Sequence, residues 1–465
     1  MTTTMRSPHP MQAAPERARR VSPPQGLLAF VAGISLFVVY LLWVHGGNLS
    51  ALRAGGGATL TSLGRLTGLF SADLLLIQVL MMARVPWIER AFGQDTLARY
   101  HRIVGFTSIN LMLVHVVAIT VGYAATDHHG LIGEAWSLVT TYPGMLLATA
   151  ASAALIMVAV TSVRAARRRL RYESWHLLHL YAYLGVGLAL PHEIWTGEDF
   201  VGTAPARAYW WTLYLVTAGA IVVFRLGLPV WRSIRHDLRV AAVIEETPGV
   251  ISVYLNGRHL DRLGVRAGQF FNWRFLSHEG WTRAHPYSLS AAPRRDQLRI
   301  TVKDLGDGSQ ALRHLRRGTR VLIEGPYGRL TGDRRRRPAM TLLACGIGIT
   351  PLRAILESEP YHPGHATLIY RASRNEDFTF AAELEALARV RGVQLYYLPG
   401  PRHPDVSWAP ATMSNPIGTL TRMAPLIAST DVFVCGPFDW MESVIATLRS
   451  LGVPPAQIHH ERFGW

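Results

Sequence analysis

Four histidines have the residue type and spacing to bind iron. His101 and His115 are 14 residues apart, and His179 and His192 are 13 residues apart, each pair within an apolar segment. An ionisable side chain inside a bilayer is costly and usually functional. Fourteen helical residues rise about 21 Å, which leaves room for two haems within a hydrocarbon core of about 30 Å. The chain has two cysteines, too few for a four-cysteine iron–sulfur cluster.

These spacings predict an inner haem between His101 and His179 and an outer haem between His115 and His192. The first pair projects from nearly one helix face, because 14 residues return to within about 40°. The second pair would diverge by about 140° on an ideal helix, so we expect Pro191 to kink or end the helix there. A single intramembrane histidine could instead hydrogen-bond a neighbouring helix, but two pairs at matched depths favour iron.

One alternative ligand stays open for the inner haem. His176 lies one turn before His179 and faces a similar side of the helix. Its spacing of 16 residues to His192 matches the first pair less well.

A bundle of membrane-spanning helices must position these histidines. Hydrophobic residues make up 49% of the 465-residue chain, and their long runs lie before about position 230. A span needs about 20 apolar residues. The sequence therefore predicts six spans, at about 27–45, 60–83, 101–123, 143–163, 174–191 and 208–228.

Charge placement predicts an orientation. The net charge is +16, and many arginines lie between the apolar runs, around the predicted inner ends of the spans. The outer loops contain Arg53 and Arg207. Basic residues are enriched in cytoplasmic loops, so we expect a multi-pass cell-membrane protein, in contact with membrane lipid, with both termini cytoplasmic. This placement argues against nucleic-acid binding.

From about residue 236 the sequence changes to short alternating strands separated by turns. Glycine lets a backbone approach phosphate closely, and a serine N-cap begins the helix that follows. Two motifs there carry the resemblance described below and are cofactor-binding candidates through it: His285, Pro286, Tyr287 and Ser288, and then Lys303, Gly308 and Ser309. For Lys303, a plain exposed strand residue is the alternative.

A second glycine motif directly follows the apolar strand 340–344 and precedes a helical pattern. A glycine-rich loop in this position predicts a dinucleotide-phosphate site. Its candidate residues are Gly346, Gly348, Thr350 and Pro351. Arg371 and Arg374 end the next apolar strand, a position that in the family resembled below meets the adenosine ribose, where two guanidiniums would suit a 2′-phosphate. We therefore favour NADPH over NADH.

With these motifs the chain resembles the ferric reductase and NADPH oxidase family, the membrane branch of the ferredoxin-NADP reductase superfamily, over roughly residues 60–465. The resemblance implies a six-helix transmembrane bundle that binds two b-type haems. It further implies an antiparallel β-barrel that binds FAD and an α/β Rossmann-like domain that binds NAD(P). We expect a disordered tail at 1–26, the haem domain at 27–230, the FAD barrel at 236–335 and the NAD(P) domain at 338–465.

The resemblance also assigns roles to single residues. In the family the aromatic of the first motif packs on the isoalloxazine and the hydroxyl bonds its polar edge, here Tyr287 and Ser288. The next glycine motif holds the FAD pyrophosphate. The turn Cys435-Gly436-Pro437 would lie beside the nicotinamide, and Trp465, or else Phe463, would stack on the flavin. Cys435 and either aromatic could instead serve only packing.

Together these features predict an NAD(P)H-dependent flavocytochrome oxidoreductase. Electrons would pass from cytoplasmic NADPH through FAD and two haems to a small acceptor outside, ferric iron or oxygen. Ligation by two histidines leaves no open iron position, so the haems would relay electrons. Two alternatives stay open: delivery to an extracytoplasmic protein partner, and a flavin reductase with a haem-free membrane anchor.

Overall fold

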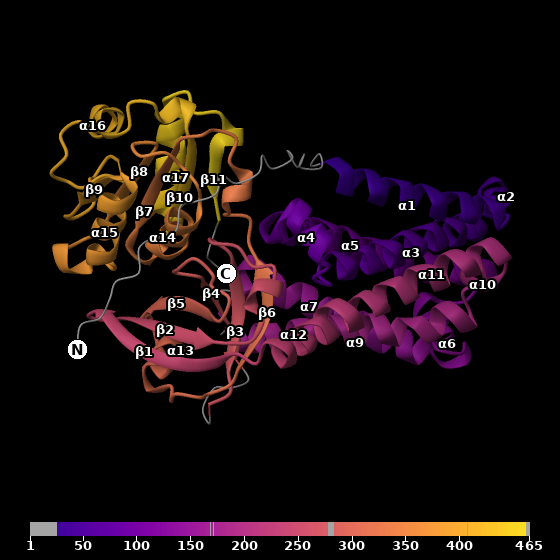
Figure 1. The fold of residues 1–465 in the computed structure, drawn as a ribbon. Helices are drawn as coiled ribbons and strands as arrows, with labels where there is room; N and C mark the ends of the chain where they lie inside the picture. Colours follow the sequence, from indigo (N-terminus) through magenta and orange to yellow (C-terminus); the bar gives the residue numbers. More distant parts are fainter. Residues whose placement is uncertain (1–25, 168, 171, 278–282, 407, 462–465) are drawn as a thin grey trace. The chain divides into compact units, whose positions relative to one another are not determined.

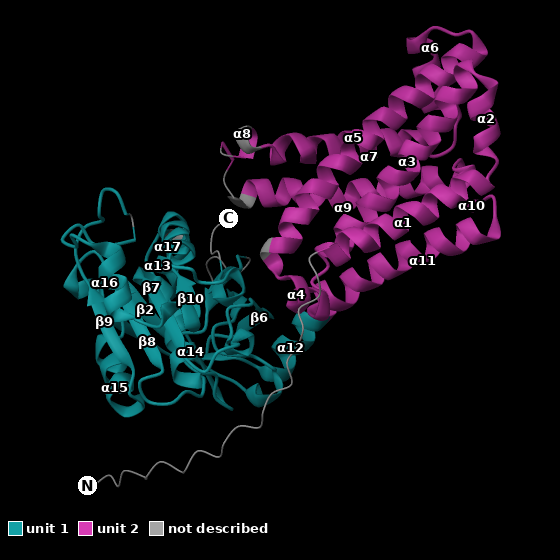
Figure 2. Cartoon of the chain, turned by 90° about the horizontal axis from the view of Figure 1, so that it is seen from above, with its two compact units in different colours: residues 1–22, 228–465 teal, residues 23–227 magenta. Residues whose placement is uncertain are grey.

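The computed structural model describes residues 26–465 apart from 168, 171, 278–282, 407 and 462–465. It divides into two compact units, one including Leu228–Trp465 and the other Pro23–Gly227 (Figure 2).

The unit Pro23–Gly227 is helical in its described residues (Figure 1). Its long helices are α1 (Gly26–His45), α3 (Gly56–Met81), α5 (Gln94–Asp127), α7 (Met145–Ser162), α9 (Tyr172–Trp195) and α11 (Ala204–Ala220), the last continuing as a π-helix (Ile221–Gly227). The short helices are α2 (Asn48–Ala54), α4 (Pro86–Phe92), α6 (Leu131–Thr141), α8 (Arg164–Arg167) and α10 (Glu198–Val201).

Each of the six predicted spans coincides with one long helix. Five helices are long and apolar enough to cross a membrane: α1, α3, α5, α7 and the continuous stretch that begins with α11. α9 has 24 residues but is not among them, and its imidazoles lower its mean hydropathy. A crossing by α9, and with it the count of six, stays a prediction.

Small residues bring α3 and α5 into close contact. A Cβ atom added to Gly57 would lie 2.5 Å from the carbonyl oxygen of Gly122, and one added to Gly64 would lie 3.0 Å from the Ile119 side chain. Small residues let helix backbones approach closely where burial from water supplies no driving force. This contact fixes α5, which carries two of the four candidate iron ligands, against α3.

The other unit begins with α12 (Leu228–His236) and continues into two three-stranded antiparallel sheets, ordered β1-β2-β5 and β4-β3-β6. The strands are β1 (Arg239–Thr247), β2 (Val250–Asn256), β3 (Phe270–Phe275), β4 (His285–Ser288), β5 (Gln297–Lys303) and β6 (Val321–Tyr327). We call residues 239–327 the β subdomain; it also contains α13 (Asp307–Gln310).

The two sheets of the β subdomain share one apolar core. Phe271 and Trp273 from β3 pack there with Val253 from β2 and Ile300 from β5, all fully buried. Isolated bridges pair Arg239 with Arg320 and Leu289 with Ile300 and so connect the sheets. The predicted antiparallel architecture is confirmed, while closure into a barrel stays a prediction.

Residues 340–460 form the α/β subdomain, as predicted for the nucleotide-binding part. Its sheet is parallel, in the order β11-β10-β7-β8-β9. The strands are β7 (Met340–Cys345), β8 (Ala366–Arg371), β9 (Gln394–Leu398), β10 (Asp431–Cys435) and β11 (Ile458–His460). The helices are α14 (Ile349–Ser358), α15 (Ala381–Arg391), α16 (Pro416–Met423) and α17 (Phe438–Ser450).

Strand order in this sheet reverses next to β7. The chain goes from β7 to β8 and β9 on one side, and returns to β10 and β11 on the other. Open α/β sheets bind ligands outside the carboxyl ends of the strands at such a reversal. The ends of β7 and β10 are therefore where a nucleotide is expected.

Candidate functional site

The structure brings His101 of α5 and His179 of α9 together. Their ring centroids are 5.9 Å apart, with the ring planes at 66°. When two imidazoles bind one iron from opposite sides, each ring centroid lies one metal–nitrogen bond of about 2.1 Å plus half a ring from the metal. The two centroids are then separated by roughly 6 Å. The observed spacing thus fits one iron between the two rings. The alternative ligand, His176, lies near enough to His179 for their charges to interact.

His115 of α5 and His192 of α9 form the second pair, close enough for their charges to interact. A glycine lies against the ring of His115, and another lies against the backbone of His192. A Cβ added to Gly68 of α3 would lie 2.5 Å from Nδ1 of His115, and one added to Gly144, before α7, would lie 2.9 Å from the backbone nitrogen of His192. α9 continues through Pro191 to Trp195, so the helix does not end at the proline.

The two imidazoles of α5 have defined proton positions. Nδ1 of His115 lies 2.7 Å from the carbonyl oxygen of Gly64, and Nδ1 of His101 lies 3.3 Å from that of Gln78. A carbonyl only accepts hydrogen bonds, so Nδ1 carries the proton and donates it. Nε2 of each ring therefore keeps the lone pair that binds a metal.

The two imidazoles of α9 contact hydroxyl groups instead. Nδ1 of His192 lies 2.7 Å from Oγ1 of Thr196, whose own proton is donated to the carbonyl oxygen of His192. With the Thr196 proton on that carbonyl, Nδ1 of His192 donates to Oγ1 and Nε2 is left unprotonated. Nδ1 of His179 lies 3.3 Å from Oγ of Ser162. Such partners orient a metal-bound histidine and fix its tautomer.

The donor set suits haem better than a bare ion. Across the described residues, no group of three or more His, Cys, Asp or Glu side chains could hold a metal ion. Paired imidazoles need no third protein ligand in a haem site, because the porphyrin supplies the remaining four nitrogens.

In the β subdomain, the structure brings the first two cofactor motifs into contact. The rings of His285 and Tyr287 on β4 are stacked, with centroids 5.9 Å apart at 17°. A Cβ added to Gly308 would lie 2.6 Å from the ring of His285, so the glycine turn lies directly against it. The indole nitrogen of Trp273 donates to the carbonyl oxygen of Tyr287 and holds the strand. Burial raises the pKa of Tyr287 to about 12, which keeps the phenol neutral.

The remaining residues of these motifs have local roles. Oγ of Ser309 accepts from the backbone N–H of Leu305 and donates to the carbonyl oxygen of Gly306, which closes the turn. Lys303 is exposed at the end of β5, and Ser288 is buried at the end of β4. Pro286, which separates His285 from Tyr287 in the sequence, is half-buried.

The two glycine turns of the α/β subdomain meet where the strand order reverses. Gly346 has a φ of +55°, which favours glycine. A Cβ added to Gly348 would lie 2.3 Å from the carbonyl oxygen of Cys435 and 2.8 Å from the nitrogen of Gly436. Any larger residue at position 348 would therefore separate the turns. Thr350 donates through its hydroxyl to the carbonyl oxygen of Ile347 and fixes the loop.

Other predicted residues flank these turns. Pro351 is buried in the first turn of α14, and Pro437 directly precedes α17. Burial raises the pKa of the Cys435 thiol, so this side chain is a neutral thiol at physiological pH and not a thiolate nucleophile. Its predicted place beside the nicotinamide stays a prediction.

The two arginines assigned to a 2′-phosphate have different environments. Arg371 is buried, and its guanidinium donates to the carbonyl oxygens of Leu398 and Gly400. Arg374 is exposed and forms ion pairs with Glu376 and Asp377. Arg371 thus holds β8 to the chain that follows β9, and Arg374 is the one of the two with an exposed guanidinium.

Arg374→Glu is expected to lower kcat/KM for NADPH roughly tenfold more than for NADH, because a charge-assisted contact to the 2′-phosphate is replaced by repulsion. Steady-state kinetics with both nucleotides measure this ratio. Arg389→Glu is the matched control, since Arg389 is exposed on α15. Equal losses for the two nucleotides would remove the basis for preferring NADPH.

Two predicted residues, Phe463 and Trp465, lie outside the described residues. The neighbouring Glu461 was not predicted as a site residue. Its carboxylate is buried, accepts from the backbone N–H of Arg329 and lies against Gly328. A glutamate between polar neighbours carries no sequence signal of burial, so this position was not identifiable from the chain alone.

Two family models match the chain. The model described as "Ferric reductase like transmembrane component" matches residues 67–190, and "Oxidoreductase NAD-binding domain" matches residues 342–445. The first match includes His101, His115 and His179 and ends two residues before His192, and the second covers both glycine turns of the α/β subdomain.

Similar proteins are reductases and flavohaemoproteins. The chain is 31% identical over 242 residues to the ferredoxin reductase component of 3-ketosteroid-9-alpha-monooxygenase from Mycolicibacterium smegmatis, which covers 49% of this chain and 65% of that protein. It is 31% identical over 189 residues to a flavohemoprotein of Vibrio cholerae, covering 38% of this chain and 46% of that one. The matches thus span less than two thirds of either relative.

A similar solved structure is the flavohem-like FAD/NAD-binding domain of nitric oxide dioxygenase from Vibrio cholerae. It is 25% identical, covers 50% of this chain and 99% of that one, and has a TM-score of 0.40. The chain thus contains one segment similar to a ferric reductase-like transmembrane component and another similar to an oxidoreductase NAD-binding domain.

Proposed function

We propose that this protein carries electrons across a membrane, from cytoplasmic NADPH through FAD and two b-type haems to an acceptor on the outer side. The observation that carries the proposal is the state of the four imidazoles. Each contacts a partner through Nδ1. The ring centroids of His101 and His179 are 5.9 Å apart, a separation that accommodates one iron between the two rings.

When bound, FAD accepts two electrons and a proton from NADPH as a hydride and passes the electrons on one at a time to haem iron. The protein's part is to position these groups and keep them from water. Tyr287 would offer a neutral aromatic face to the flavin, with His285 and the Gly308 turn beside it. The turns at Gly348 and Gly436 would bind the nucleotide. Their close contact fixes the position of one turn relative to the other.

The helices α5 and α9 would hold the haems at two depths. On α5 the two histidines are separated by about 21 Å of helix, and α9 supplies the opposite ligand to each. Closely packed glycines of α3 keep α5 in place. Arginine placement supports this direction, which would put the His101 pair near the cytoplasm and the His115 pair near the outer face.

Sealed vesicles test the direction of transfer. NADPH is supplied on the cytoplasmic side, and superoxide and ferrous iron are both measured in the opposite compartment, with no protein added there. We expect at least one of the two products to accumulate there in proportion to NADPH oxidised. Oxidation of NADPH with reduced acceptor confined to the cytoplasmic side would refute transmembrane transfer. Reduction that requires an added protein would favour a protein acceptor.

A further inference from the structure

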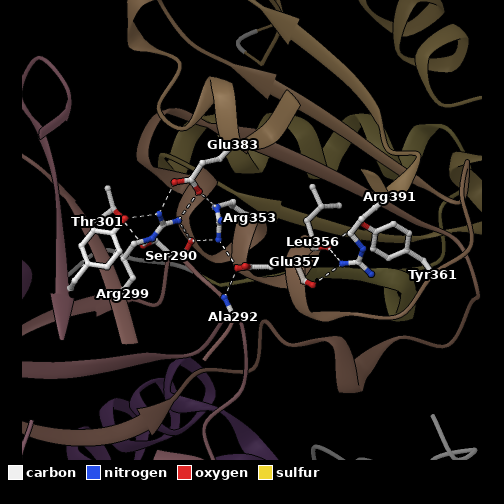
Figure 3. A network of polar contacts seen from close by, with 11 residues as sticks. Ser290, Ala292, Arg299, Thr301, Arg353, Leu356, Glu357, Tyr361, Glu383 and Arg391 are labelled. Carbon is white, nitrogen blue, oxygen red and sulfur yellow. Dashed lines mark hydrogen bonds and ion pairs between the residues drawn. The ribbon is translucent and has the colours of Figure 1, made fainter. Parts of the chain in front are cut away.

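The β and α/β subdomains are connected by a group of charges that no cofactor motif includes, made of two buried arginines and two partly exposed glutamates. It consists of Arg299 on β5, Arg353 and Glu357 on α14, and Glu383 on α15, which we call the Arg–Glu bridge (Figure 3). Arg299 and Arg353 are 5% and 7% exposed. Charges this buried persist in proteins when each is paired and hydrogen-bonded.

Glu383 is the centre of the bridge. Its two carboxylate oxygens accept from the two terminal nitrogens of Arg299 at 2.7 and 3.0 Å, a bidentate contact from one subdomain to the other. One of the same oxygens lies 2.6 Å from Nε of Arg353. Bidentate arginine–carboxylate pairs fix orientation as well as distance. Glu383 therefore sets where both guanidiniums lie.

The bridge is connected to the strand that carries the flavin motif. Ser290 follows β4 by two residues, and its carbonyl oxygen accepts from Arg299 at 2.9 Å and from Arg353 at 3.0 Å. Arg353 also contacts Glu357 at 2.6 Å, and Glu357 accepts from the backbone N–H of Ala292 at 2.7 Å. One carbonyl thus receives an arginine from each subdomain.

The other end of the bridge belongs to the nucleotide loop. Arg353 is on α14, which begins directly after Gly348, and Glu383 is near the start of α15. Phe380, which precedes α15, has a φ of +65°, unusual for an aromatic residue. Phe380 is buried, and its ring lies against the guanidinium of Arg299. The distance from the ring centroid to the guanidinium carbon is 4.6 Å. This disfavoured backbone places Glu383 against the β subdomain.

We propose that Glu383 is a positioning residue for hydride transfer: through the Arg–Glu bridge it fixes the nucleotide-binding turns relative to the flavin-binding strand. The inference deepens the proposed function and rests on its NADPH-to-FAD step alone. An apolar contact is independent of the bridge: Ala267 of the β subdomain and Leu330 of the segment between the subdomains belong to one buried cluster with Ile355 of α14. We expect it to keep the subdomains associated when the bridge is broken, so that the variants below retain the fold.

The test uses the full-length, detergent-purified protein loaded with FAD and mixed with NADPH in a stopped-flow instrument. Glu383→Gln should slow the limiting rate of flavin reduction about 10- to 100-fold, as expected for a displacement of about 1 Å at a reacting centre. The dissociation constant of NADPH should change by less than about threefold, because the binding turns themselves are intact. Glu385→Gln, exposed two residues along α15, is the matched control and should match the wild type.

Chemical rescue distinguishes positioning from a general loss of stability. The bridge borders a cavity of about 280 Å³ lined by Glu383, Arg299 and Arg353. In Glu383→Ala, added formate can enter and restore a carboxylate between the arginines, so it should recover at least part of the limiting rate. Acetamide, which is uncharged, should not. Glu383→Asp keeps the charge and should fall between the wild type and Glu383→Gln.

A readout without cofactors uses hydrogen exchange in the FAD-free protein. Exchange of the peptide that contains Ala292 should become faster in Glu383→Gln and stay unchanged in Glu385→Gln. The inference is overturned by a wild-type limiting rate in Glu383→Gln, by a change in NADPH affinity with an unchanged limiting rate, or by formate having no effect. A wild-type flavin that NADPH does not reduce would instead refute the proposed function.

Discussion

Replacing His101 by leucine is expected to leave about one haem per chain and to reduce transfer to an external acceptor by about 100-fold or more. Loss of a ligand should exceed the 10- to 100-fold cost of changing a ligand's hydrogen-bond partner. Leucine is apolar and of similar length, so α5 keeps its packing against α3. Haem per chain and the reduced-minus-oxidised spectrum measure the loss, and flavin reduction by NADPH should keep its wild-type rate.

The control for this substitution is His45→Leu. His45 is exposed at the end of α1 and is not paired with another candidate ligand in our assignment. It should retain both haems. His179→Leu should reproduce the loss seen in His101→Leu, because the two rings would bind one iron. If either ligand variant keeps two haems with wild-type spectra, the assigned pairing is wrong.

Adding one methyl group at Gly68 is expected to disrupt the outer haem. The Cβ of Gly68→Ala would lie 2.5 Å from Nδ1 of His115, far inside van der Waals contact. The ring must move away from the Gly64 carbonyl that now orients it. We expect haem affinity at this site to fall about 10- to 100-fold, with the inner haem still reduced by NADPH and outward transfer lost in proportion.

Gly219→Ala controls for adding a methyl group to a membrane helix. Gly219 is on α11, and a Cβ added there meets no described atom within 4 Å. Alanine is also the better helix former. This variant should bind both haems with wild-type affinity. A Gly68→Ala protein with two normal haems would show that His115 is not held as an axial ligand in the observed position.

Sequence patterns predicted much of the fold because they are local. Apolar runs of sufficient length coincide with the six long helices, and the glycine motif after residue 344 begins α14 after a buried strand, as predicted. The same reasoning failed to establish a count of six spans. The histidines that would give α9 its function also make it less apolar, so length and hydropathy alone do not identify it as a span.

The site was less predictable where it depends on contacts distant in sequence. Thr196 is one turn from His192 and could have been found by its spacing. The Gly64 carbonyl is 51 residues from His115, and backbone acceptors carry no sequence signal. Arg371 and Arg374 both end the same strand pattern in the sequence. In the structure, however, the guanidinium of Arg371 donates to the backbone carbonyls of Leu398 and Gly400. Arg299 and Glu383 are 84 residues apart, and neither occurs in a recognisable motif.

Anaerobic addition of NADPH to the purified protein, with flavin, haem and protein all quantified, shows whether electrons pass from NADPH through flavin to two haems. We expect one FAD and two bis-histidine b-type haems per chain, with both haems reduced after the flavin. A fully loaded preparation in which NADPH reduces the flavin but no stoichiometric haem is present would contradict this expectation.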